Sequence, residues 1–553
     1  MTTAADGVAP TRRDWLALAV LSIGLGMIVL DGTIVGVALP DIISDLDMDL
    51  TDAQWVSSLY AAILAALLLS TGRLADRWGR KRLFIAGLVV FMAGSVLAAM
   101  AEASGPLIGA RAVQAVGAAL IMPSTLSTVN AVFRGRYRAA AFGVWGAVIS
   151  GAAAVGPLAG GALTEYASWQ WIFLVNVPLG ALVLVAALLV VPETRGETPG
   201  PGADVDGALL SAIGFGALVF SVIEGPELGW WAPKAEFQLF GWVWPADAPI
   251  SVIPITLAIA AVALVLFVLW ERHRAGNGRS ALLDLALFRL PTFTWGNVTA
   301  GAVAVGEFAI IFVLPLYLVN ALGLNAMGAG LVLAAMALGA FASGAAARHV
   351  AARFGSPGTV LIGLGLEVVG VVIVALVVAA TTPGWLVALP LVIYGLGLGL
   401  ASAQLTGTVL RDVPVAQSGQ GSATQSTVRQ VGSALGTAFA GAALSIALAL
   451  TLPASLGSAG FSGTAADSVA EATRQSAGTT IAQLREQGTS SPLGDQTPAV
   501  VDALAVGFAD ATRWALLVAS VFLLLGLVGA MRLRVAARRD PVRDARDTAR
   551  SAG

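Results

Sequence analysis

The sequence contains no cysteine, so it can form neither a disulfide framework nor a thiolate metal site. It has only two histidines, His273 and His349, and both lie in short basic segments. No G-x-x-x-x-G-K-[ST] phosphate-binding loop is present, and Lys81 and Lys234 are the only lysines. We therefore expect no metal, no cofactor and no ATP-driven motor. A membrane-embedded enzyme is a weak alternative, because no buried histidine or nucleophile–base pair is evident.

Charged residues are also scarce. They make up 12% of the 553 residues, whereas a soluble protein has roughly a quarter. Hydrophobic residues reach 57% and the mean hydropathy is +0.84. This apolar excess must face lipid, so we expect a polytopic membrane protein with no nucleic-acid partner. The apolar run after Arg12 and Arg13 has no clear small-residue cleavage site, which predicts an uncleaved first span.

Apolar runs of the length that crosses a bilayer, roughly 20 residues, recur along the chain. The predicted fold class is an all-α polytopic membrane protein with fourteen transmembrane helices. We expect these at residues 15–39, 52–71, 83–101, 106–130, 139–163, 170–191, 206–223, 250–270, 295–319, 327–348, 358–380, 384–409, 426–451 and 511–531.

Basic residues favour one side of the predicted membrane. Four of the 31 lie in the outer segments (Lys234, Arg474, Arg485 and Arg513), Arg111 lies within a span, and the other 26 are assigned to the inner segments. This bias predicts cytoplasmic termini and a multi-pass protein of the plasma (inner) membrane. The longest outer connector, 453–510, is expected to hold short helices at about 465–484 and 500–510.

The chain also resembles itself at a constant offset of 276 residues. "RWGRKRLFIAGL" at 77–88 aligns with "RFGSPGTVLIGL" at 353–364, and "VGPLAGGAL" at 155–163 aligns with "VGSALGTAF" at 431–439. Two parallel halves around a central site are typical of secondary transporters. We therefore expect a short N-terminus, a six-helix half, an inserted helix pair, a second six-helix half and a basic tail, at 1–14, 15–191, 192–294, 295–531 and 532–553.

The same offset pairs two intramembrane carboxyl groups. It carries Asp31 in "GMIVLDGTIVGVALP" to Glu307 in "AVAVGEFAIIFVLPL", and a proline follows each acid, at Pro40 and Pro315. A charged side chain at the bilayer centre costs roughly 2.5–3.5 kcal/mol, so each needs a compensating reason. We expect both to bind protons or cations; the alternative is a structural, hydrogen-bonded carboxyl group.

Three more polar residues within spans are candidates. Arg111 and Gln114 are three residues apart and share a helix face. The alternative for Arg111 is an interfacial side chain that reaches outward. Glu367 lies mid-span but matches Phe91 in the repeat, so symmetry does not support it, and its functional and structural interpretations stay equal. Glu224 and Glu227 are expected to anchor a loop.

Two glycine-rich motifs complete the candidates. The connector "GRLADRWGRKRL" at 72–83 combines a tight turn, an acid and basic residues, and its gate candidates are Gly72, Asp76, Arg77, Gly79 and Arg80. In span 5, small residues allow close helix approach, and packing alone is the alternative to a functional role. The residues singled out there are Gly151, Gly156, Pro157, Gly160 and Gly161.

The connector resembles the signature G-x-L-a-D-r-x-G-r-k-x-x-l of the major facilitator superfamily. "LDGTIVGVALP", "ARAVQAVGAAL", "GAAAVGPLAGG" and "WQWIFLVNVPLG" further resemble its fourteen-span drug:proton antiporter branch. The resemblance implies a gate latch at the connector, proton transfer by Arg111, and exchange rather than symport through the span-5 motif. Gly36 replaces the usual Asn and Ala115 the usual Gly, so a polar contact is lost and packing is altered.

The expected function is proton-coupled export of amphipathic drugs or related small molecules by alternating access, with Asp31 and Glu307 facing a central cavity. Its partners would be a small amphipathic or cationic substrate, protons and membrane lipids, with the chain acting as a monomer and a proton gradient in place of a cofactor. The alternatives are export of a lipid, siderophore or endogenous metabolite by the same fold, and a receptor that does not transport.

Overall fold

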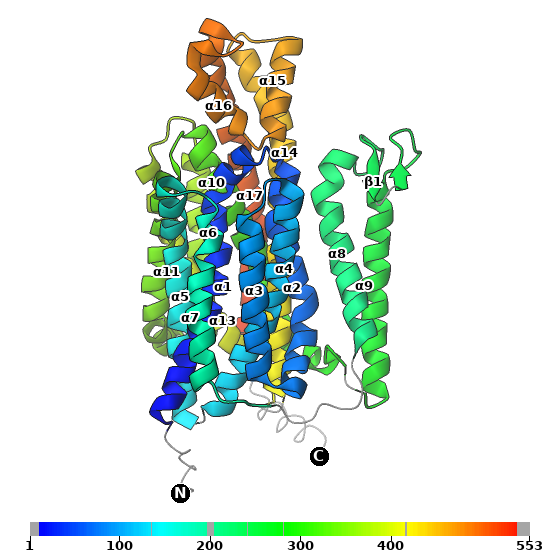
Figure 1. Ribbon diagram of the computed structural model, residues 1–553, viewed down its shortest axis with the longest axis vertical. Coiled ribbons are helices and arrows are strands. Elements are labelled where there is room, and N and C mark those ends of the chain that lie inside the picture. The colour runs from blue at the N-terminus through cyan, green and yellow to red at the C-terminus, as the bar shows by residue number, and fades with distance from the viewer. Residues whose placement is uncertain are drawn as a thin grey trace, which may run out of the picture.

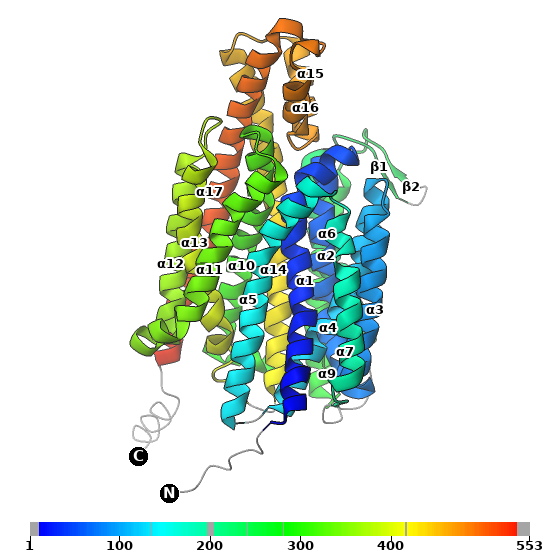
Figure 2. The same ribbon diagram turned by 60° about the vertical axis from the view of Figure 1, so that its left-hand side comes forward.

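The computed structural model describes residues 10–133, 135–195, 204–239, 242–279, 281–414 and 417–538. Most of these residues form long helices that stand side by side in one bundle (Figures 1 and 2). Residues 1–9 of the expected N-terminal segment and 539–553 of the expected basic tail lie outside the described residues.

We call the first seven helices of the chain the first group: α1 (Arg12–Asp45), α2 (Leu50–Trp78), α3 (Arg80–Ala99), α4 (Ser104–Val132), α5 (Gly135–Tyr166), α6 (Trp171–Leu174) and α7 (Asn176–Val190). Then come α8 (Val205–Leu228), the strands β1 (Phe237–Leu239) and β2 (Trp242–Trp244), and α9 (Val252–Gly276). β1 and β2 pair antiparallel, a small sheet that the sequence analysis did not predict.

The second group comprises α10 (Pro291–Leu316), α11 (Ala326–Phe354), α12 (Ser356–Val377), α13 (Gly384–Val409), α14 (Ser418–Ser458) and α17 (Thr497–Arg538). A 3-10 turn (Leu285–Arg289) precedes α10, and a π turn (Tyr317–Ala321) follows it. The short helices α15 (Thr464–Gln475) and α16 (Thr479–Gln487) lie between α14 and α17, followed by 3-10 turns at Gly488–Ser490 and Gly494–Gln496.

Thirteen helical segments of the described residues are long and apolar enough to cross a membrane. α5, a 32-residue helix whose side chains are only partly described, is not among them and runs beside α1 and α11 (Figure 2). The all-α membrane fold is therefore confirmed. The predicted span 170–191 is divided into α6 and α7, which together cross as one segment, Trp171–Val190.

The connector predicted at 453–510 is shorter than expected. α14 continues to Ser458 and α17 begins at Thr497, so the predicted helix at 500–510 and the last span are one 42-residue helix. Pro498 lies in its first turn, where proline is favoured, and no proline follows up to Arg538. The helix predicted at 465–484 is instead two helices, separated by the positive φ angles of Ala477 and Gly478.

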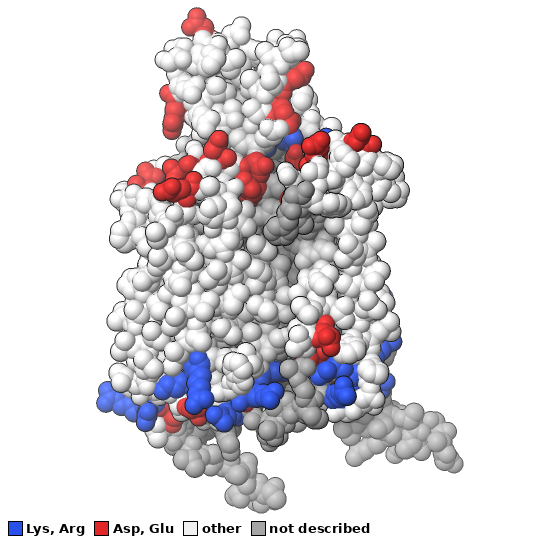
Figure 3. All heavy atoms as spheres, turned by 45° about the vertical axis from the view of Figure 1, so that its right-hand side comes forward, with Lys and Arg blue, Asp and Glu red and all other residues white. Residues whose placement is uncertain are grey.

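The two ends of the bundle differ in charge. α1 begins and α17 ends at the same end (Figures 1 and 2). Most Lys and Arg visible in Figure 3 gather there, whereas most Asp and Glu lie at the other end. We call the first the basic end, and the second, which carries α15 and α16, the cap end. The bundle therefore has the charge asymmetry that orients membrane proteins.

We call α15 and α16 the cap. Arg474 of α15 donates to Glu471 through Nε and Nη2, to Glu227 of α8 at 2.7 Å and to Ser445 of α14 at 2.9 Å. On the other side, Arg485 donates to the carbonyl oxygens of Asn320 and Ala321. The cap is therefore tied to α8, to α14 and to the π turn that follows α10.

Replacing Arg474 with Gln is expected to speed amide hydrogen exchange in α15 about two- to thirtyfold, because it removes two partly exposed ion pairs that contribute roughly 0.2–1 kcal/mol each. The hydrogen bonds from Arg474 also lower the pKa of Glu471 from its ordinary 4.5. This stabilisation is present above pH 4.5 and is lost as the pH falls through the lowered pKa. Hydrogen exchange measured by mass spectrometry should change little for the exposed control Arg532→Gln. Equal protection of α15 in the two variants would contradict the role of Arg474 in holding the cap.

α8 and α9 stand beside the main bundle, at the right in Figure 1. α8 packs against α2 of the first group and α14 of the second, and α9 packs on α8. At the cap end, the indole nitrogen of Trp55 donates to Glu224 at 2.8 Å and ties α2 to α8. The pair thus contacts one helix from each group.

Candidate functional site

Asp31 lies in the middle of α1 and has no exposed surface. Its Oδ2 atom accepts a hydrogen bond from Nη1 of Arg111 at 2.5 Å, and its Oδ1 atom accepts from Gln114 at 3.1 Å and from Asn176 at 2.8 Å. The sequence analysis expected this carboxyl group to face a central cavity. The structure instead encloses it among the first-group helices α1, α4 and α7.

Arg111 is also enclosed, with a side chain only 2% exposed. Its guanidinium group lies 4.2 Å from the centroid of the Tyr60 ring, and its Nε donates to the carbonyl oxygen of Val56. A cation over an aromatic face is attracted to it, and more strongly where water is excluded. The alternative in which Arg111 reaches outward to the interface is therefore wrong; the side chain is directed to Asp31.

The structure adds α3 to this cluster through Ser95 and Gly94. The hydroxyl of Ser95 accepts from Gln114 at 2.8 Å and from Asn176 at 3.3 Å. A Cβ atom on Gly94 would lie 2.6 Å from the backbone nitrogen of Gln114, so only glycine lets α3 come this close to α4. The result is a hydrogen-bonded network that joins five transmembrane helices, α1, α2, α3, α4 and α7, around one ion pair.

Glu307 of α10 has a different environment. Its carboxylate lies 3.3 Å from Nη2 of Arg429 on α14, and only 6% of its side chain is exposed. The side chain of Arg429, however, is 50% exposed. The Glu307 ion pair is thus open on one side, whereas the Asp31 pair is closed.

Glu367 of α12 is fully buried near this second pair. Within the described residues, neither of its carboxyl oxygens has a hydrogen-bond partner, and the same holds for the hydroxyl of buried Tyr394. Glu367 interacts electrostatically with both Glu307 and Arg429. Folding therefore brings two acids, one arginine and one tyrosine together from four helices, although the repeat gave Glu367 no support.

The gate candidates form a turn at the basic end. Arg80 donates to Asp76 through both Nε and Nη2, at 2.9 and 2.7 Å, and through Nη1 to the carbonyl oxygen of Ser127 on α4. Gly79 has a φ of +115°, which favours glycine, and Gly72 lies near Pro123 of α4. Arg77 is exposed on the surface. The turn thus links α2, α3 and α4.

The glycines of α5 contact two different helices. Cβ atoms on Gly156 and Gly160 would collide with Thr33 and Ile34 of α1, and one on Gly161 would lie 2.7 Å from the carbonyl oxygen of Ala326 on α11. The carbonyl oxygen of Pro157 is 2.6 Å from the Cβ position of Gly330, also on α11. At Gly151, in contrast, a Cβ atom would meet nothing within 4 Å. Four of the five residues therefore pack helices closely, two of them between the groups.

Gly36, where the resemblance led us to expect Asn, lies at another contact between the groups. Its Cβ position is 3.5 Å from the side chain of Ile311 on α10. Two hydrogen bonds also join the groups, from Ser58 to the carbonyl oxygen of Ala434 and from Asn325 to Glu165. Gly36 therefore places no polar side chain at this interface between the two groups of helices, where the resemblance led us to expect one.

The sequence analysis missed Arg429 and Asn176 as site residues. Arg429 was counted with the inner basic residues although it lies inside the predicted span 426–451, and this position was a usable signal. Asn176 lies inside the quoted motif "WQWIFLVNVPLG", where an amide within an apolar run was a second signal. Ser95 and Tyr394 offered no such signal, because both residue types are common in apolar helices.

The family model of the Major Facilitator Superfamily matches residues 21–437. The chain is 31% identical to the multidrug resistance protein Stp of Mycobacterium tuberculosis, covering 80% of this chain and 78% of Stp. It is also 31% identical to the multidrug efflux pump LfrA of Mycolicibacterium smegmatis, covering 80% of this chain and 84% of LfrA.

Among solved structures, a bacterial homologue of the human lysosomal transporter Spinster has a similar fold, with a TM-score of 0.61 at 17% identity, covering 96% of this chain and all of that one. The family match spans most of the chain, and the two relatives are matched over most of their own length. The chain therefore belongs to the Major Facilitator Superfamily and is a membrane transporter rather than an enzyme.

Proposed function

We propose that the protein is a proton-coupled antiporter that exports amphipathic drugs or related small molecules across the plasma membrane by alternating access. The names of the relatives Stp and LfrA support drug export. The observation that carries the proton-coupled part is the buried ion pair between Asp31 and Arg111, which lies within the membrane-spanning helices α1 and α4.

Protonation of Asp31 would neutralise the only carboxylate that pairs with Arg111 among the described residues. A buried guanidinium group without its counter-ion is strongly unfavourable, so proton binding would favour a rearrangement of α1 against α4. Arg111 and Gln114 would orient this proton site, and Asn176 would stabilise its ionised form.

Glu307 is the proposed substrate-linked carboxyl group. Because Arg429 is half exposed, a cationic or hydrogen-bonding substrate could compete with it for the Glu307 carboxylate. Glu367 lies beside this pair, and a proton on its carboxyl group removes the cost of a buried charge without a hydrogen-bond partner. With two acids next to one arginine, one carboxyl group would bind the substrate while the other holds a proton, so the two could be exchanged.

The energy source is the proton gradient rather than a cofactor, since each charge that crosses 100 mV gains about 2.3 kcal/mol. The basic end would face the cytoplasm, which places both termini inside. There the Asp76–Arg80 pair would latch the gate between α2, α3 and α4. We further propose that the transporter acts as a monomer.

The test uses inside-out membrane vesicles with an acidified lumen and ethidium as the probe. Adding ethidium is expected to release protons from vesicles that contain the wild-type protein. Glu307→Gln should reduce this flux at least tenfold, or about 1.4 kcal/mol, because Arg429 loses its counter-ion and the carboxylate proposed to bind the substrate is gone. The exposed control Glu236→Gln should behave as wild type.

Equal ethidium-driven proton flux in wild type and Glu307→Gln would contradict the role of Glu307. Absence of proton flux with ethidium, tetraphenylphosphonium and neutral antibiotics, combined with transfer of a labelled lipid, would favour the alternative of lipid export.

A further inference from the structure

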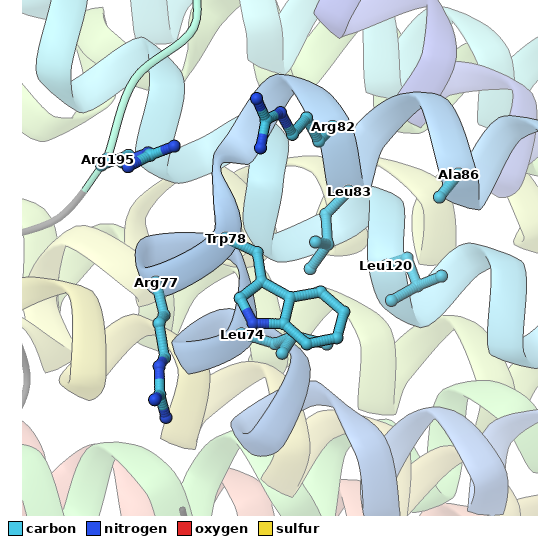
Figure 4. A pocket seen from close by; sticks show the side chains of 8 residues that line it. All are labelled: Leu74, Arg77, Trp78, Arg82, Leu83, Ala86, Leu120 and Arg195. Atoms are coloured by element: carbon cyan, nitrogen blue, oxygen red, sulfur yellow. The ribbon is translucent and has the colours of Figure 1, made fainter. Parts of the chain in front are cut away.

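A pocket of about 510 Å³ opens at the basic end, between the end of α2, the beginning of α3 and the middle of α4. Three arginines line it: Arg77, Arg82 and Arg195. In Figure 4 Arg77 and Arg195 lie at the left and Arg82 lies at the top near the centre, whereas Ala86 and Leu120 lie at the right, with Leu83 between them and the arginines. The pocket thus has a cationic side and an apolar side.

The apolar side begins where a membrane surface is expected. Trp78, which is 59% exposed, stands between the arginines and the leucines, and exposed tryptophans are enriched at the level of lipid headgroups. From Arg80 to Ala86 the helix α3 rises about 9 Å toward the middle of the bundle. The pocket therefore extends from headgroup level into the region of the acyl chains.

The segment that carries Arg195 is held in place by α3. The backbone nitrogen of Arg80 donates to the carbonyl oxygen of Thr194 at 3.0 Å, and that of Lys81 donates to Glu193 at 3.1 Å. A Cβ atom on Gly79 would lie 2.6 Å from this carboxylate. These contacts bring Arg195, which follows α7, to an arginine cluster formed by α2 and α3.

The cluster keeps a net positive charge. Glu193 lies 3.8 Å from Arg82 and neutralises part of the positive charge of the cluster. The nearby Asp76 forms an ion pair with Arg80, which is not one of the three arginines. Within the described part of the chain, Arg77 and Arg195 take part in no ion pair. Two guanidinium groups are therefore free to bind an anion beside the apolar groove.

We propose that this pocket binds an anionic phospholipid, with its phosphate group on the arginines and the upper part of an acyl chain along Leu83, Ala86 and Leu120. Arginine matches phosphate geometry through two parallel hydrogen bonds. A soluble anion would use only the cationic side. A zwitterionic lipid could use both sides, but the three arginines would repel its ammonium group, so the pocket favours an anionic lipid. The bound lipid would contact Arg77 and Trp78, which lie between Asp76 and Arg80 in the gate turn.

The test is native mass spectrometry of the full chain in detergent, titrated with phosphatidylglycerol, phosphatidylcholine or sn-glycerol 3-phosphate. Phosphatidylglycerol is expected to bind most tightly to the wild type. The triple variant Arg77→Gln, Arg82→Gln and Arg195→Gln should weaken it on the order of a hundredfold, because each basic residue near anionic lipid contributes about 1 kcal/mol and 1.4 kcal/mol is tenfold.

Two controls separate the pocket from general charge. The triple variant Arg272→Gln, Arg348→Gln and Arg353→Gln removes three exposed arginines elsewhere and should keep near wild-type affinity. Ala86→Trp retains every arginine but fills the apolar side, and it should lose phosphatidylglycerol binding while unfolding at the wild-type temperature.

Equal loss in the two triple variants, unchanged binding in Ala86→Trp, or equal affinity for phosphatidylglycerol and sn-glycerol 3-phosphate would each overturn the proposal. Because the readout is lipid binding, it does not depend on the proposed transport function.

Discussion

Replacing Asp31 with Asn is expected to abolish substrate-driven proton movement and to destabilise the protein by about 3–5 kcal/mol. The amide cannot ionise, and it leaves the Arg111 guanidinium, which is 2% exposed, without its counter-ion. Arg111→Gln should destabilise the protein to a similar extent, because it leaves the buried Asp31 carboxylate with only the donors Gln114 and Asn176.

The double variant Asp31→Asn, Arg111→Gln distinguishes coupling from structure. It removes both charges and keeps hydrogen-bonding amides, so the thermal unfolding temperature should recover most of the loss seen in either single variant. Proton flux in vesicles should remain absent, because the ionisable group is missing. Recovery of proton flux in the double variant would show that Asp31 is a structural carboxyl group, the alternative weighed from the sequence.

The second large effect is expected at Gly161, where α5 of the first group lies in close contact with α11 of the second. Gly161→Ala places a Cβ atom 2.7 Å from the backbone oxygen of Ala326, so α5 and α11 must separate at the cap end. Overpacking of this kind costs about 1–3 kcal/mol. It should shift the population away from the arrangement in which α5 and α11 touch at the cap end by roughly five- to 150-fold, and reduce export accordingly.

Gly151→Ala is the matched control within the same helix, since a Cβ atom there meets nothing within 4 Å. The native absence of cysteine allows Tyr166→Cys and Trp385→Cys to carry spin labels on exposed cap-end positions of the two groups. The distance between the two labels, measured by pulsed electron spin resonance, should lengthen in Gly161→Ala and not in Gly151→Ala. Identical distance distributions in the two variants would contradict the expected separation of α5 and α11 in Gly161→Ala.

Much of the transmembrane architecture could be predicted because apolar runs report directly on burial in lipid. The relation between Arg111 and Gln114 was also predictable, since a three-residue spacing places both on one helix face, and they do bond to each other. Helix ends were predicted less well. α14 and α17 project beyond the apolar segments, and local hydropathy does not register a helix that continues outside the membrane.

The partners of the intramembrane charges could not be predicted in the same way. Asp31 and Glu307 look equivalent in the repeat, yet one lies in a closed network and the other faces a half-exposed arginine. Their difference arises from Ser95, Asn176 and Arg429, which reach the sites from other helices.

Spacing along the chain therefore establishes that this is a helical membrane protein with acids at two matched depths, because hydropathy and helical periodicity act over neighbouring residues. Tertiary structure decides which acid is enclosed, which arginine pairs with it and where the arginine-lined pocket opens. These features depend on contacts between residues far apart in the chain: Asp31 and Arg111 are 80 residues apart, and Glu307 and Arg429 are 122 apart. Such contacts depend on side-chain packing in three dimensions, and no local pattern encodes them.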